Sequence, residues 1–170
     1  MVGRYLLVMA GVMLYFLPAL SQTLVKRLEK TEISTLLSQL QKNSTISCIA
    51  DREDFQFPLK REDLMQMRRE QFTCFQQLML EQIFALFSTE YSLAAWNQNL
   101  LKQLLSNLYR SRKNLEPVEQ SSLACHSFGI ALRKYFRRIH LYLKRKKYSD
   151  CAWEVVRVEI MRSFWLSTTT

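Results

Sequence analysis

The chain has few of the residues that make tight turns, sheets and phosphate-binding loops. Its 170 residues include three glycines and three prolines, and beyond residue 21 only Gly129, Pro58 and Pro117 remain. Tight hairpin turns depend on glycine, so this composition disfavours a sheet-rich fold. A single glycine also cannot build a glycine-rich loop around a phosphate. The scarcity therefore predicts a mainly helical protein with no nucleotide-binding loop of that kind.

Catalytic and metal-binding signatures are missing as well. The sequence has two histidines and contains neither an HExxH nor a GxSxG motif. Cys125 and His126 are adjacent, but neighbouring helical residues point about 100° apart, whereas a catalytic pair must converge. Asp51, Glu53 and Asp54 lack the spacing of a calcium-binding loop, so we expect them to form salt bridges. We predict no enzymatic activity, no cofactor and no metal site.

The amino terminus has the pattern of a secretory leader. Arg4 precedes an apolar run that ends before Pro18, and small residues follow at Ala19 and Ser21. The run is too short to span a membrane and has the order of a signal peptide. We predict a signal peptide at residues 1–21, cleaved after Ser21, and a secreted domain at residues 22–170 with no membrane insertion. An uncleaved amino-terminal anchor is the alternative.

Four cysteines are present, at Cys48, Cys74, Cys125 and Cys151, and none has the close spacing of a zinc site. In an oxidising compartment this even number predicts two disulfides, whose pairing the residues alone leave open. The single N-glycosylation sequon begins at Asn43 in a predicted loop, where an exposed side chain would carry a glycan.

Apolar residues recur at helical spacing over most of the chain after the leader. The expected helices cover residues 23–41, 61–87, 93–112, 121–146 and 148–165. Ser149 or Asp150 would cap the last of them. The long connection between the first two helices can cross from one end of a bundle to the other. These features predict an all-α, five-helix cytokine bundle with a long crossover loop between the first and second helices.

The charge balance is strongly basic. There are 24 Lys and Arg residues against 15 Asp and Glu, giving +9, or +8 once Arg4 leaves with the leader. Cations gather on the fourth predicted helix, at Arg133, Lys134, Arg137, Arg138 and residues 144–147. Such a cluster resembles a polyanion site, but a solvated or protein-binding helix face explains it better in a secreted chain, and we predict no nucleic-acid partner. The alternative function is a secreted cationic host-defence protein acting on membranes or polyanions.

The last predicted helix has more apolar surface than one buried stripe requires. Its core stripe would be Trp153, Val156, Ile160 and Phe164. A second face would carry Glu154, Val158, Met161, Arg162 and Trp165, with Arg157 at the border. Exposed tryptophan, methionine and arginine are typical of protein interfaces, whereas packing on neighbouring helices is the other explanation.

Three stretches carry a family resemblance over essentially the whole chain after the leader. They are "SCIADREDFQFP" at 47–58, "FALFSTEYSLAAW" at 84–96 and "ALRKYFRRIHLYLKRKKYSDCAWEVVRVEIMRSF" at 131–164. They closely resemble the type I interferons. The missing amino-terminal cysteine, the short link at 114–121, and Cys74 with Cys125 resemble the short, delta-type trophoblast members of that family.

The resemblance implies a monomeric, secreted cytokine that brings together two receptor chains, one bound tightly and one weakly, to trigger antiviral and antiproliferative signalling. It pairs Cys48 with Cys151, which leaves Cys74 for Cys125. The residues matching the tight site are Ile49, Arg52, Arg157, Val158, Met161, Arg162 and Trp165. Those matching the weak site are Tyr109, Arg133 and Lys134. Ile49, Val158 and Trp165 depart from the usual family residues, so affinity does not follow from the match.

Overall fold

The computed structural model describes residues 2–118 and 122–168, with side chains described from residue 17 onward. Within these residues the fold is all-helical and has no strand. The elements are α1 (Val2–Gln39), the short 3-10 helix η1 (Ile49–Asp51), α2 (Arg61–Met65), α3 (Arg69–Phe87), α4 (Glu90–Ala95), α5 (Gln98–Lys113), α6 (Leu123–Arg145) and α7 (Asp150–Leu166).

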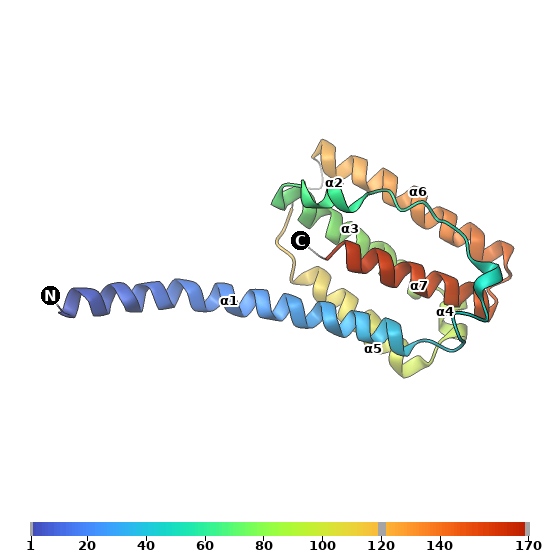
Figure 1. Ribbon diagram of the computed structural model, residues 1–170, viewed down its shortest axis with the longest axis horizontal. Helices are drawn as coiled ribbons and strands as arrows, with labels where there is room; N and C mark the ends of the chain where they lie inside the picture. The colour runs from blue at the N-terminus through green and yellow to red at the C-terminus, as the bar shows by residue number, and fades with distance from the viewer. Residues whose placement is uncertain (1, 119–121, 169–170) are drawn as a thin grey trace.

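Five long helices form the bundle. The helix α3 packs between α5 and α6, while α1 packs against α5 and α7, and α7 also contacts α6. The crossover loop between α1 and α2 turns at η1 and then runs back along the bundle to α2 (Figure 1). The predicted cytokine-like arrangement with one long early crossover is therefore present.

The helix α1 is longer than the expected range of 23–41. It runs unbroken from Val2 to Gln39, and its amino-terminal half extends beyond the bundle (Figure 1). The first 21 residues include several leucines and methionines, which favour helix, and Pro18 does not end the helix. Among the described residues, no helix combines the length and hydropathy that a membrane crossing needs.

Two predicted helices are each divided in the structure. The expected helix 61–87 breaks between α2 and α3, where the Arg68 N–H donates to the Gln71 side chain at 3.2 Å. The expected helix 93–112 breaks at Asn97, whose Oδ1 accepts hydrogen bonds from the N–H groups of Asn99 and Leu100. Side chains that satisfy free backbone N–H groups start new helices at both points.

The predicted core stripe of α7 is confirmed. Trp153, Val156, Ile160 and Phe164 are each at most 2% exposed. Ser149 is the cap, because its Oγ accepts from the Ala152 N–H at 3.2 Å. The stripe packs on the main core of leucine and aromatic side chains from the other long helices.

Both predicted disulfides are present. Cys48 bonds Cys151 and ties the crossover loop to the start of α7, across 103 residues of sequence. Cys74 bonds Cys125 and joins α3 to α6 near the start of each helix, with a Cα–Cα separation of 5.9 Å. Such bonds stabilise chiefly by restricting the unfolded chain.

Candidate functional site

The crossover loop is held against α6 by hydrogen bonds and ion pairs. The Tyr142 hydroxyl donates to the Asp51 carbonyl oxygen at 2.7 Å, and Lys146 pairs with the Asp51 carboxylate at 2.8 Å. Arg145 pairs with Glu53. Farther along the loop, Arg138 donates to the carbonyl oxygens of Phe55 and Gln56 at 2.8 and 2.9 Å. The loop therefore has a fixed position on the bundle, and the expected salt bridges of Asp51 and Glu53 are confirmed.

The contacts also divide the cationic cluster of α6. Three of its cations, Arg138, Arg145 and Lys146, form intramolecular contacts that hold the crossover loop. Arg133 and Lys134 remain exposed on the outer side of α6. The cluster therefore does not form one continuous free strip for a polyanion.

A buried ion pair lies where α7 meets α1 and the crossover loop. Arg157 donates to both carboxylate oxygens of Glu154, at 2.9 and 2.6 Å, and to the Leu37 carbonyl oxygen at 3.0 Å. Thr45 of the loop donates its hydroxyl to Glu154 at 3.0 Å. Glu154 is 1% exposed and Arg157 is 2% exposed. These four residues join three segments of the chain.

This pair corrects the expected outer face of α7. Glu154 was expected on that face and Arg157 among the receptor contacts, yet both are buried because α7 packs against α1 and the crossover loop as well as α6. Leu37 lies in the last turn of α1, where carbonyl groups lack helical partners. Arg157 therefore caps the last turn of α1 and positions α7. Its side chain is buried and is not available for direct contact with a partner.

The rest of the second face is accessible. Arg162 and Trp165 are exposed, and Val158 and Met161 are half-buried. Arg162 donates to Glu159 at 3.0 Å, and this hydrogen bond raises the pKa of its guanidinium. The spacing of these residues places them on one side of the helix.

The crossover loop adds two more exposed residues beside α7. Ile49, in η1, is 61% exposed, and Arg52 follows directly after η1. The helix η1 contacts α7, and the Cys48–Cys151 disulfide fixes it there. Ile49 and Arg52 thus belong to the same side of the bundle as the outer face of α7. We call this set of accessible residues the α7 surface: Ile49, Arg52, Val158, Met161, Arg162 and Trp165.

The three residues matched to a weak site lie on helices that flank α3. Tyr109, on α5, is half-exposed and lies under the Lys113 ammonium, whose nitrogen is 5.2 Å from the ring centroid. Arg133 and Lys134 are exposed on α6. The helix α3 lies between α5 and α6, on the side of the bundle away from the contact between α1 and α7. The structure therefore places Tyr109 apart from Arg133 and Lys134, on one broad side formed by three helices.

Two exposed apolar residues lie outside the predicted apolar stripes. Phe84, on α3 and so on this broad side, is 37% exposed, and Leu93 on α4 is 43% exposed. An aromatic residue off the stripe at position 84 is the sequence signal that could have identified this surface.

Among the described residues, no group of three His, Cys, Asp or Glu side chains could hold a metal ion. Instead, arginines lie beside apolar side chains on the α7 surface. Arginine beside apolar side chains is typical of protein–protein interfaces.

Comparison with known proteins identifies close similarity. A family model described as the interferon alpha/beta domain matches residues 22–170. Human interferon alpha-7 is 47% identical over 140 residues, which cover 78% of this chain and 74% of that protein. Horse interferon omega-2 is 47% identical over 136 residues, covering 76% of this chain and 70% of that protein.

A solved structure shows the same fold. Zebrafish interferon 2 has a TM-score of 0.69 to this chain, covering 85% of this chain and 97% of that one, at 22% sequence identity. At this identity the likeness concerns the arrangement of helices alone.

Proposed function

Because the chain belongs to the interferon alpha/beta family, a family of cytokines and not of enzymes, we propose that it signals by bringing together the two chains of the type I interferon receptor. The observation that carries this proposal is the α7 surface, where exposed Arg162 and Trp165 lie beside half-buried Met161. Antiviral and antiproliferative signalling would follow from kinases attached to the two receptor chains. The cytokine itself would hold the two receptor chains close together and would catalyse no reaction.

The α7 surface is proposed to bind the tighter receptor chain. Trp and Arg dominate interface hot spots, and each such anchor contributes about 2 kcal/mol or more. Trp165 is 47% exposed, so its ring has apolar area left to bury against a partner. The disulfide at Cys48 keeps Ile49 and Arg52 in place before binding, which reduces the entropy lost on association.

The side formed by α5, α3 and α6 is proposed to bind the weaker chain. Tyr109, Arg133 and Lys134 are exposed there, and Phe84 supplies apolar area between them on α3. The two proposed surfaces lie on different helices, since α3 packs between α5 and α6, whereas α7 packs on α1, α6 and η1. Two receptor chains could then bind at once without contesting the same residues.

A binding experiment tests the first surface. Each of the two receptor ectodomains is titrated with the wild-type protein and with a variant carrying Met161→Ala and Arg162→Ala. We expect affinity for one chain to fall by roughly a thousandfold, since two contacts are lost at about 2 kcal/mol each, and affinity for the other to stay unchanged. A matched control carries Arg61→Ala and Leu123→Ala, which remove an exposed arginine and an exposed apolar residue elsewhere.

An antiviral assay on responsive cells completes this test. Protection should be lost in the Met161 and Arg162 variant, with helical circular dichroism unchanged, and kept in the control. Full protection by the variant would refute the α7 surface. Binding of the wild-type protein to neither ectodomain would refute the function and return the question to a cationic host-defence protein.

We also propose that residues 1–21 are removed and that the secreted protein is a monomer with a glycan at Asn43. The family model begins at residue 22, which supports this boundary. Asn43 is half-buried in the crossover loop, where its carbonyl oxygen accepts from Gln41 at 3.0 Å. Intact mass of the secreted protein before and after glycosidase treatment tests the cleavage and the glycan, and sedimentation tests the monomer.

A finer assignment, to the short delta-type trophoblast members, is a further proposal. It is supported by the Cys74–Cys125 bond and by the absence of a cysteine at the proposed mature terminus, residue 22. Transcript measurement in trophoblast and in virus-challenged leukocytes tests it. Expression confined to the leukocytes would refute the assignment without affecting receptor binding.

A further inference from the structure

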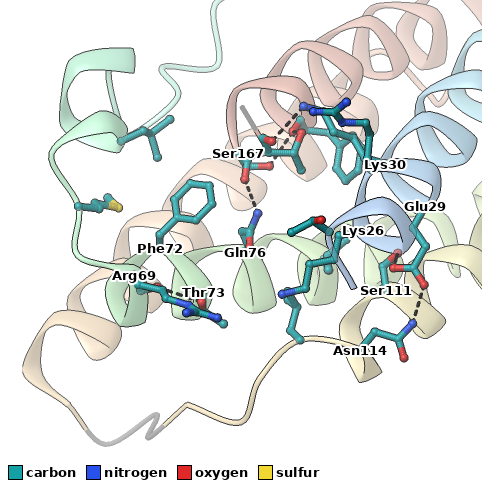
Figure 2. Close-up of a pocket in the computed structure, with 18 of the residues that line it drawn as sticks. Lys26, Glu29, Lys30, Arg69, Phe72, Thr73, Gln76, Ser111, Asn114 and Ser167 are labelled. Atoms are coloured by element: carbon teal, nitrogen blue, oxygen red, sulfur yellow. Dashed lines mark hydrogen bonds between the residues drawn. The ribbon is translucent and has the colours of Figure 1, made fainter. Parts of the chain in front are cut away.

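A pocket of about 780 Å³ opens at the end of the bundle where α7 finishes. Its walls come from α1, α2, α3, the end of α5 and the end of α7. Figure 2 shows Phe72 and Gln76 of α3 facing Lys26 and Lys30 of α1 across the space. Pockets that hold small molecules commonly measure about 300–1,000 Å³.

The inner part of this pocket is apolar. Leu64, Phe72, Leu80, Leu115 and Phe164 line it. Leu64 and Phe164 are at most 2% exposed and form the base of the pocket. Phe72 and Leu115 are half-buried, so part of each side chain is accessible from the pocket. An apolar chain placed there would bury these side chains from water at about 25 cal/mol per Å².

The α1 wall carries cations. Lys26, Arg27 and Lys30 line the pocket, and Arg69 faces them from α3. Lys30 donates to the Thr168 carbonyl oxygen at 2.9 Å, and Arg69 pairs with Glu116 at 2.6 Å, so both are engaged. Within the described part of the chain, Lys26 and Arg27 form no ion pair.

One carboxylate also lines the pocket. Glu29 is buried, and its oxygens accept from Asn114 at 2.5 Å and from Ser111 at 3.3 Å, with Arg110 at 3.7 Å. These partners hold the Glu29 carboxylate against the end of α5, as Figure 2 shows for Ser111 and Asn114. The net charge of the lining side chains remains positive, and the free cations lie on α1.

We propose that this pocket binds a single-chain anionic amphiphile such as a long-chain fatty acid. The hydrocarbon chain would lie on Phe72, Leu80 and Phe164, and the carboxylate would lie beside Lys26 and Arg27. Opposite charges at a partly closed apolar site attract more strongly than at an open surface. The pocket lies at the end of α7 away from Cys151, Ile49 and Arg52, and it adjoins the α7 surface at Trp165, whose ring centroid is 5.9 Å from the Lys30 ammonium nitrogen. Fatty-acid binding is measured without receptor, so its failure would leave the proposed receptor binding untouched.

The experiment uses protein secreted by cells that express the complete chain, stripped of bound lipid, with both disulfides formed. The probe is cis-parinaric acid, a fluorescent fatty acid, and its methyl ester is the neutral comparison. We expect saturable fluorescence enhancement by the acid, displacement by non-fluorescent oleate, and affinity for the ester about tenfold weaker. The ester lacks the charge that meets the two exposed cations Lys26 and Arg27, and each such pair contributes up to about 1 kcal/mol. Vesicles of phosphatidylserine test the other source of an anionic amphiphile, a membrane leaflet.

Two variants locate the site. Reversing both free cations, by Lys26→Glu and Arg27→Glu, should weaken the acid about tenfold and leave the ester unchanged. Filling the space with Leu115→Trp should weaken both probes. The matched control reverses Lys102 and Lys144 to Glu, which changes the net charge equally on exposed positions outside the pocket.

Three results would overturn the proposal. They are the absence of saturable binding by the secreted protein, an equal loss of binding in the matched control, and binding of the protein to vesicles but not to the free acid.

A variant that fails to secrete is replaced by Thr73→Val, which adds no volume and removes a pocket hydroxyl. This variant should bind the acid no more weakly than wild type. A large loss of acid binding in Thr73→Val would equally contradict the assigned apolar contacts.

Discussion

The substitution Arg157→Met tests whether Arg157 positions the α7 surface rather than contacting the receptor directly. The substitution keeps much of the side-chain volume but removes two hydrogen bonds to Glu154 and one to Leu37. It leaves the Glu154 carboxylate almost fully buried without its cation. Breaking a buried ion pair in this way costs about 3–5 kcal/mol.

Urea unfolding followed by circular dichroism measures that loss. With a slope of about 2 kcal/mol per molar, the midpoint should fall by roughly 2 M. The double substitution Glu154→Leu and Arg157→Met removes both charges, and most of the stability should return. Receptor affinity of the double variant should stay close to wild type, because neither side chain reaches the surface.

The matched comparison is Arg162→Met. Arg162 pairs with Glu159 at the same spacing of three residues, but its side chain is 55% exposed. The Glu159 side chain is 11% exposed, but it keeps the hydrogen bond from the Tyr135 hydroxyl at 2.7 Å when Arg162 is replaced. The urea midpoint should therefore fall by less than for Arg157→Met, while receptor affinity falls. An unchanged midpoint for Arg157→Met, or a double variant that regains stability but not affinity, would refute the positioning role of Arg157.

Three other predictions concern the fold around the two surfaces. Replacing Cys48 and Cys151 together by alanine should cost about 2–4 kcal/mol of unfolding free energy and weaken binding at the α7 surface, as measured by thermal unfolding and receptor titration. Burial, then Asp51 and Glu53, raise the pKa of Tyr142 to about 12, so stability should fall as the pH rises from about 10, where the unfolded phenol ionises, towards 12. That part of the alkaline loss should be absent in Tyr142→Phe, as measured by urea unfolding between pH 9 and 12. Below pH 9 this variant should be less stable by about 0.5–1.5 kcal/mol, because the hydrogen bond to the Asp51 carbonyl oxygen is lost. Asn97→Ala removes the cap of α5 and should lower the unfolding free energy by about 1 kcal/mol in urea melts, with receptor affinity unaffected.

The sequence was sufficient for the fold class and for the buried stripe of α7. Trp153, Val156, Ile160 and Phe164 recur at helical spacing, and helical spacing depends only on local geometry. The breaks at Arg68 and Asn97 were missed, because a side chain that caps a new helix leaves the apolar periodicity almost unchanged.

The burial of Glu154 and Arg157 could not be read from periodicity either. Polar residues on a helix are normally assigned to the solvated face, and their partner Leu37 lies 120 residues away in sequence. The spacing of Glu154 and Arg157 was a local signal for an ion pair, but it does not show whether the pair is exposed. For Asp51 and Glu53 the salt bridges were expected, whereas the choice of Lys146 and Arg145 as partners required the folded chain.

The attachment of the crossover loop to α6 affects how scanning mutagenesis of this cytokine should be interpreted. Arg138, Tyr142 and Lys146 belong to a helix proposed to serve one receptor chain, yet they hold the loop that carries Ile49 and Arg52, which are proposed to bind the other. We therefore expect alanine at these positions to reduce binding to the tighter chain by releasing the loop, without the loss of a direct contact. If the binding site of the tighter chain were mapped from affinity losses alone, part of it would be assigned wrongly to α6. Measuring hydrogen exchange of the crossover loop in the same variants would show which losses come from release of the loop.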